Sequence, residues 1–192
     1  MRPAALTIII IAATAMTMAA CTSTQTGQAL PSASQTAMSS SGESPGSNGL
    51  AGLNACTLLT DAEAQQVVSG AEGHRDLGEQ GGSGTSACSW NKSATNDTPS
   101  HAIGVTVRPA QGLKDIVVGP SAQLLNLTTS QGRQAAIVKN IRGRGTCMVS
   151  VAVGSGRVDL FDAVVGVGAS TDSACSVVGK VSDYVEPRLP KS

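Results

Sequence analysis

TCMVSVAVGSGRVDLFDAVV, residues 146–165, is the stretch of the chain that decides its fold. Every second residue in its first half is apolar, which is the period of a strand buried on one face. The residues that share this face are Cys147, Val149, Val151 and Val153. The following Gly154-Ser155-Gly156 segment favours a hairpin turn, so the sequence predicts that the chain reverses there and returns as a strand over residues 157–165.

Three more segments have the pattern of strands. Cys88-Ser89-Trp90 places a cysteine and a tryptophan on one face, and residues 103–107 alternate Ile or Val with small or polar residues before Pro109. Residues 134–141 are a further predicted strand. Residues 112–127 hold two short apolar clusters on either side of a Gly-Pro pair, and these predict two helical turns or a broken helix.

Two helices are predicted, one before and one after these strands. Thr60-Asp61-Ala62-Glu63 is a capping box, and it is followed by a helical apolar stripe that ends near Gly70. Ser170-Thr171-Asp172 offers N-caps for the second helix, which we expect to end at Pro187. Its apolar stripe consists of Ala174, Val177, Val178, Val181 and Val185. The predicted fold class is α+β, an antiparallel sheet packed by an N-terminal and a C-terminal helix with two disulfides.

The start of the chain has the form of a lipoprotein export signal. Residues 1–20 carry Arg2 and then an uncharged run from Pro3 to Ala20, and Met18-Ala19-Ala20 precedes Cys21. Lipoprotein processing needs a thiol at that place to carry a diacylglyceryl group, so we predict an anchor on Cys21 and a location at the extracytoplasmic face of the cell membrane. Simple secretion is the alternative; a transmembrane helix is disfavoured because the run is short and lacks flanking charges.

The chain therefore divides into three parts. Residues 1–20 are the signal, and residues 21–49 are a Ser-, Thr- and Gly-rich tether whose composition is typical of disorder. Residues 50–192 have the size of one domain. Because this domain holds only three aromatic residues, its core must consist of Val, Ile, Leu and Ala; the three are Trp90, Phe161 and Tyr184.

The remaining four cysteines point to disulfides. An even number in an oxidising compartment implies two bonds, with three possible connectivities. Cys147 lies on the apolar face of a strand and Cys175 beside the stripe of the last helix, so a Cys147–Cys175 bond would clamp that helix to the sheet. By the same logic Cys56–Cys88 would tie the entry of the first helix to the tryptophan strand. A metal site is disfavoured, because the sequence has no Cys-x-x-Cys pair and no histidine near a cysteine.

Several motifs together resemble a known family. The chain has Cys56-Thr57-Leu58-Leu59-Thr60, then Cys88-Ser89-Trp90, two further cysteines and a closing Leu189-Pro190. This pattern, with the lipobox and the tether, resembles the actinobacterial lipoproteins that carry domain of unknown function 3558, over roughly residues 50–190. The resemblance implies an exported α+β domain with two disulfides, and it supplies no catalytic residues.

The sequence favours a non-catalytic binding or sensor module for an unknown envelope protein, glycan or lipid. The formal net charge is zero and no basic stripe is present, which disfavours nucleic acid. An envelope hydrolase is one alternative, but the chain has no Gly-x-Ser-x-Gly motif and we expect both histidines, His74 and His101, in exposed loops. A lipid carrier is another, and it would need an apolar cavity between sheet and helices. No cofactor motif is present: the glycines of residues 78–84 lead into a strand rather than a helix.

Overall fold

The computed structural model describes residues 49–191, so Cys21, the signal and nearly all of the tether lie outside the described residues. The strands are β1 (Arg75–Gly78), β2 (Ser86–Lys92), β3 (Ser100–Arg108), β4 (Gln123–Thr128), β5 (Gln134–Lys139), β6 (Thr146–Val153) and β7 (Gly156–Val165). The helices are α1 (Asp61–Val67) and α2 (Thr171–Val185), with short 3-10 turns η1 (Ala55–Thr57), η2 (Leu113–Asp115) and η3 (Glu186–Arg188).

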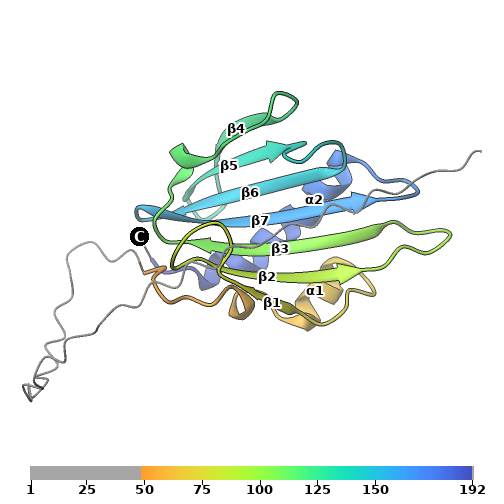
Figure 1. Cartoon of the computed structure of the whole chain (residues 1–192), viewed down its shortest axis with the longest axis horizontal. Coiled ribbons are helices and arrows are strands. Elements are labelled where there is room, and N and C mark those ends of the chain that lie inside the picture. Colours follow the sequence, from red (N-terminus) through yellow and green to blue (C-terminus); the bar gives the residue numbers. More distant parts are fainter. Residues whose placement is uncertain (1–48, 192) are drawn as a thin grey trace, which may run out of the picture. The chain divides into compact units, whose positions relative to one another are not determined.

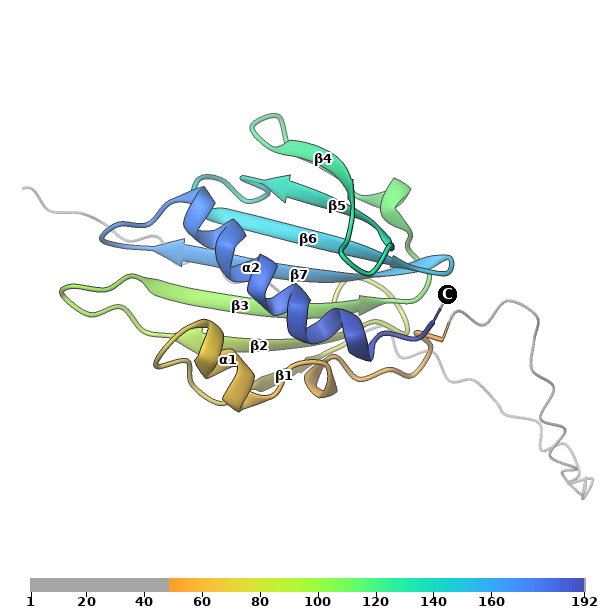
Figure 2. The same cartoon turned by 180° about the vertical axis from the view of Figure 1, so that it is seen from behind.

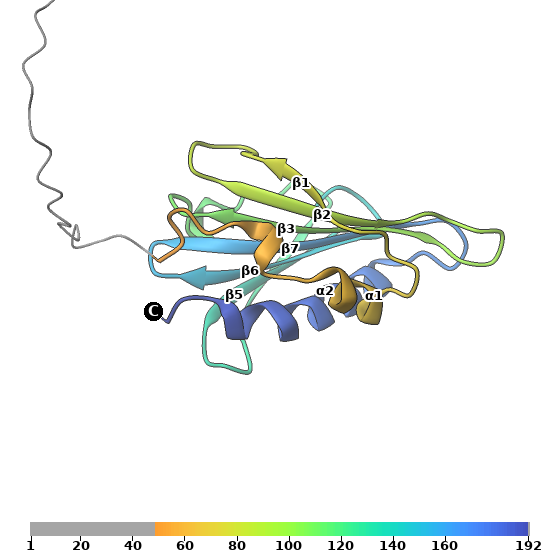
Figure 3. The same cartoon turned by 90° about the horizontal axis from the view of Figure 1, so that it is seen from below.

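The seven strands form one antiparallel sheet in the order β1-β2-β3-β7-β6-β5-β4. Both helices lie on the same face of this sheet: they are behind it in Figure 1 and in front of it in Figure 2. Figure 3 shows the sheet nearly edge-on with α1 and α2 on one side. We call the opposite side the open face. The predicted α+β class is therefore confirmed.

The core lies between the sheet and the helices. The five apolar residues of the α2 stripe are all buried, and α2 packs against β6 and β7. The predicted face of β6 is buried as well, from Cys147 to Val153. Successive residues of a strand point to opposite faces of the sheet, so every second residue of the central strands faces the core. These inward residues are Val, Ile and Leu with few exceptions.

Two disulfides hold the helical side to the sheet. Cys56–Cys88 joins η1 to β2, and Cys147–Cys175 joins β6 to α2. These are the two pairings that the positions of the cysteines predict. Each closes a loop of about 30 residues, which is worth about 3 to 4 kcal/mol when the constraint on the unfolded chain is counted alone.

Both helices begin at the predicted caps. The Thr60 hydroxyl accepts from the Glu63 amide at 3.3 Å, and the Glu63 carboxylate accepts from the Thr60 amide at 2.9 Å, which completes the capping box of α1. The Ser170 hydroxyl accepts from the Ser173 amide at the start of α2. No helix among residues 49–191 is long and apolar enough to cross a membrane.

Three details differ from the prediction. Leu124 and Leu125 lie in β4 rather than in a helical turn, because pairing with β5 in register overrides the local pattern. Only the first apolar cluster forms a turn, the 3-10 turn η2. The strand predicted to reach residue 141 ends at Lys139, since Asn140 adopts a left-handed φ of 59°. Finally, β1 has no counterpart in the prediction; its four residues are all exposed and give no alternating signal.

Candidate functional site

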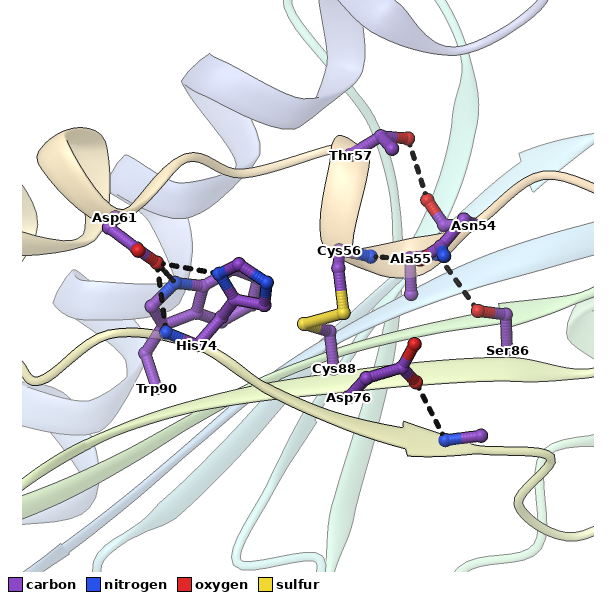
Figure 4. Close-up of a disulfide and its surroundings, with 11 residues drawn as sticks. Asn54, Ala55, Cys56, Thr57, Asp61, His74, Asp76, Ser86, Cys88 and Trp90 are labelled. Atoms are coloured by element: carbon purple, nitrogen blue, oxygen red, sulfur yellow. Dashed lines mark hydrogen bonds and ion pairs between the residues drawn. A yellow bond between two sulfur atoms is a disulfide. The ribbon is translucent and has the colours of Figure 1, made fainter.

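His74 lies in a cluster beside the first disulfide. One carboxylate oxygen of Asp61 accepts three hydrogen bonds, from the His74 amide at 2.9 Å, from His74 Nδ1 at 3.0 Å and from Trp90 Nε1 at 2.8 Å. Figure 4 shows Asp61 facing both rings, with the Cys56–Cys88 bond beside them. The bonds from His74 are the main reason why the pKa of Asp61 is lowered. The imidazole itself is about half exposed, as predicted.

This cluster has a structural role that follows from its geometry. Trp90 is fully buried, so its indole N–H needs an acceptor inside the protein. Asp61 is the first residue of α1, and the same carboxylate therefore connects the helix to β2 and to the segment that precedes β1. The arrangement holds three elements together around the only tryptophan of the chain.

His101 does not lie in an exposed loop, and that expectation is wrong. It is part of β3, shares the inward face with Ile103, and has a side chain only 11% exposed. Its Nδ1 is 3.0 Å from Oδ2 of Asp162, a fully buried residue of β7. Burial raises the pKa of Asp162, and the hydrogen bond from His101 partly opposes this. The reason for the error is that β3 begins at Ser100, three residues before the alternation of Ile and Val becomes visible.

The two histidines belong to separate pairs, and neither pair resembles a hydrolytic centre. Within residues 49–191 each imidazole has a carboxylate partner, and no serine or threonine hydroxyl bonds to either ring. A nucleophile-base-orienter arrangement needs that third member. The same part of the chain holds no group of three His, Cys, Asp or Glu side chains placed for a metal ion.

A cavity of about 450 Å³ lies on the open face, over the centre of the sheet. It exists because short side chains on neighbouring strands leave space above the backbone of the sheet. The small residues are Ala87 and Ser89 of β2 and Ala102, Gly104 and Thr106 of β3. Larger apolar side chains complete the lining, among them Leu77, Ile116, Val117, Ile141, Met148 and Phe161. A volume of this size is typical of sites for small molecules. The helix side of the sheet, where a lipid carrier would need its cavity, is filled by core side chains.

One end of the cavity carries a network of buried charges. Oδ1 of Asp159 accepts from Arg157 Nε at 2.7 Å and from the Ser150 hydroxyl at 2.6 Å. Oδ2 of Asp159 accepts from Arg108 Nε at 2.6 Å. Arg157 also donates to the carbonyl of Gly112 at 2.7 Å, which fixes the loop that leads to η2. The three charged side chains of this network are between 7% and 21% exposed.

Arg142 also lines the cavity. Its guanidinium carbon is 5.1 Å from the centre of the Phe161 ring, within the range of a cation–π contact. Its side chain forms no ion pair among residues 49–191, although its backbone amide is fixed by the Thr146 hydroxyl. Arg142 thus places a positive charge at the cavity, and the N–H groups of its guanidinium can donate to a ligand.

Sequence reasoning missed this site, but two signals were present. Three successive outward positions of β3 are small or short, Ala102, Gly104 and Thr106, while the inward residues that alternate with them are Ile and Val. In β7 three successive outward residues are Arg157, Asp159 and Phe161, an unusual set for a central strand. The contact of Arg142 with Phe161 had no signal, because it depends on how the loop between β5 and β6 folds over the sheet.

A family model described as "Protein of unknown function (DUF3558)" matches residues 16–188. No curated protein and no solved structure matches the chain. The match extends over the domain described above, including the cavity and both disulfides.

Proposed function

We infer that this chain, which belongs to the DUF3558 family of proteins of unknown function, is a membrane-anchored cell-envelope lipoprotein whose domain is a non-catalytic binding module. The observation that carries the binding role is the cavity on the open face. It is large enough for a small molecule, apolar for most of its lining, and supplied with a few fixed polar groups. We propose this cavity as the ligand site.

Two arguments support the absence of catalysis. The histidines lie in separate carboxylate pairs, and neither His74 nor His101 is among the residues that line the cavity. The charged groups that do line it are three arginines and one aspartate. At neutral pH an arginine neither gives nor takes a proton, so this set binds and orients better than it transfers protons.

The sequence around Cys21 supports the lipid anchor. Cys21 follows small residues at the end of an uncharged run, in the place where lipoprotein processing needs a thiol. Two disulfides in the domain fit an oxidising compartment outside the cytoplasm. A diacyl anchor holds firmly because each buried methylene contributes about 0.8 kcal/mol.

The binding role is tested by native mass spectrometry of the full chain isolated from its own cells. We expect the wild type to carry an added small-molecule mass and the Gly104→Leu variant to lack it, because a leucine there would project into the cavity. Gly179→Leu is the matched control: this glycine lies exposed on α2, and no atom lies within 4 Å of an added Cβ. A wild type without added mass, or one whose added mass survives Gly104→Leu, would contradict the proposal.

The lipid anchor and the absence of catalysis are tested separately. Cys21→Ala is expected to move the protein from the membrane fraction to a state that carbonate extraction releases without detergent; retention like that of the wild type would refute the anchor. A fluorophosphonate probe, which labels activated serines, is expected to leave the full chain unlabelled. Labelling that disappears in His74→Ala or His101→Ala would show a hydrolase.

A further inference from the structure

We propose that the open-face cavity takes an amphipathic anion, a small molecule with one carboxylate, phosphate or sulfonate group and an apolar or aromatic body. This inference rests on the proposed binding function and names its ligand class. Arg142 pairs with the anionic group, and the apolar body lies against Phe161 and Met148.

The charge of the cavity decides the sign of the ligand. Three guanidinium groups and one carboxylate line it, from Arg108, Arg142, Arg157 and Asp159, so the cavity carries two positive charges in excess. A concave site with low-dielectric walls concentrates such a field and attracts ions of the opposite sign. A cationic ligand would be repelled, and a neutral one would not be attracted by the net charge of these groups.

The three arginines have different tasks. Arg108 and Arg157 both donate to Asp159, and their other hydrogen bonds go to Gln111, to Gln80 and to the loop before η2, so these side chains are held in place. Among the residues that the structure describes, the guanidinium of Arg142 has only the ring of Phe161 as a partner. A planar guanidinium with free donors is well suited to the two oxygens of a carboxylate or phosphate. Arg142 is therefore the group that pairs with the anion, while the other two supply a fixed positive field.

The rest of the lining selects an apolar body. Met148 and Phe161 form the floor beside Gly104, where an added Cβ would already stand 3.8 Å from Phe161 Cβ. At the rim Val117 is 88% exposed and Leu77 is 38% exposed, so both present apolar surface to solvent. A ligand in the cavity would cover part of this surface, and burial of apolar surface favours binding.

The test uses two dyes with the same aromatic body. 1-Anilinonaphthalene-8-sulfonate carries a sulfonate, and N-phenyl-1-naphthylamine is its neutral counterpart. Both are titrated by fluorescence into the purified full chain and into Arg142→Gln, with Arg144→Gln as the matched control because Arg144 is exposed two residues away and does not line the cavity. Gly104→Leu identifies the part of each signal that comes from the cavity.

We expect Arg142→Gln to raise the Kd of the sulfonate dye at least about tenfold and that of the neutral dye less than about twofold. Arg144→Gln should leave both within about twofold, and Gly104→Leu should weaken both. If the neutral dye binds as tightly as the sulfonate and Arg142→Gln changes neither, the ligand class is wrong while the binding function stands. If Arg144→Gln weakens the sulfonate dye as much as Arg142→Gln, the effect is general electrostatics and the inference fails. If neither dye shows a component sensitive to Gly104→Leu, the ligand class and the cavity as a binding site are both refuted.

Discussion

The ion pair between Glu63 and Arg188 should make the free energy of unfolding depend on pH in the acid range, and Glu63→Gln is expected to remove most of that dependence. Arg188, at the end of η3, donates to both carboxylate oxygens of Glu63, at 2.8 Å and 2.6 Å, and also to the carbonyl of Leu58. Together with the capping bond from Thr60, these contacts lower the pKa of Glu63 from an ordinary 4.5 to about 2. The pair joins the start of α1 to the last turn of the chain.

The magnitude follows from linkage between protonation and folding. A carboxyl whose pKa falls from 4.5 to about 2 would stabilise the folded state by at most about 3 kcal/mol at neutral pH. Glu63 is 17% exposed but Arg188 is 37% exposed, so solvent screens the pair and we expect about 1 to 2 kcal/mol. Because the pKa is lowered on folding, this contribution is complete above pH 4.5 and is lost as the pH falls towards 2.

The assay is urea unfolding of the full chain followed by far-UV circular dichroism, at pH values from about 7 down to about 2.5. Glu63→Gln should be less stable than the wild type at neutral pH, and the difference should shrink as the pH falls. The glutamine can still cap α1, so the helix itself is retained. Glu72→Gln is the control, since this exposed carboxylate has only a 3.5 Å contact with the Ser93 hydroxyl. A difference between wild type and Glu63→Gln that stays constant over the whole range would refute the reasoning.

Three further predictions concern the same domain. Serine at both ends of the disulfide between β6 and α2 should lower the free energy of unfolding by about 3 to 4 kcal/mol in urea titrations, and no change would show that the bond does not form. Gly145→Ala should lower the free energy of unfolding by about 3 kcal/mol or more, because the new Cβ would lie 2.5 Å from the backbone oxygen of Val164 at a φ of +83°. Gly143→Ala, whose Cβ would meet no atom within 4 Å, should lower it by only about 1 kcal/mol; thermal unfolding measures both. Protonation of Asp61 should change the fluorescence of Trp90 with a midpoint below 3.8, the ordinary value for this carboxyl, and Asp61→Asn should abolish this change; a midpoint well above 3.8 would contradict the lowered pKa.

The helix side of the fold was predictable because it obeys simple periods. The valines of β6 repeat every second residue and those of α2 every third or fourth, and both sets face one core. The capping residues Thr60 and Ser170 mark the helix starts without any tertiary information. The two disulfide pairings were predicted as well, although the cysteine count alone allowed three connectivities, because Cys147 and Cys175 lie on apolar surfaces of a strand and a helix that pack together.

The open side was not predictable to the same degree. β1 is a strand only because it pairs with β2, across a register shift between Asp76 and Gly78. The leucines of β4 carry no local preference that separates a strand from a helical turn. The cavity depends on which small residues of different strands become neighbours, and the pairing of Gly104 with Phe161 is set by the sheet register rather than by either local sequence.

The buried charges of β7, Arg157 and Asp159, are best explained by a role in holding one wall of the cavity in place. A cluster of two arginines and one aspartate is costly to desolvate, and apolar residues of similar volume often give equal or greater stability in such places. On the helix face the same strand carries Val158 and Leu160, so apolar packing was available to this chain. What Arg157 adds is the bond to the Gly112 carbonyl, which holds the loop that places Ile116 and Val117 beside the cavity. Stability is thus supplied by one face of the sheet, through its core and two disulfides, and the other face can keep an open, positively charged hollow without unfolding the domain.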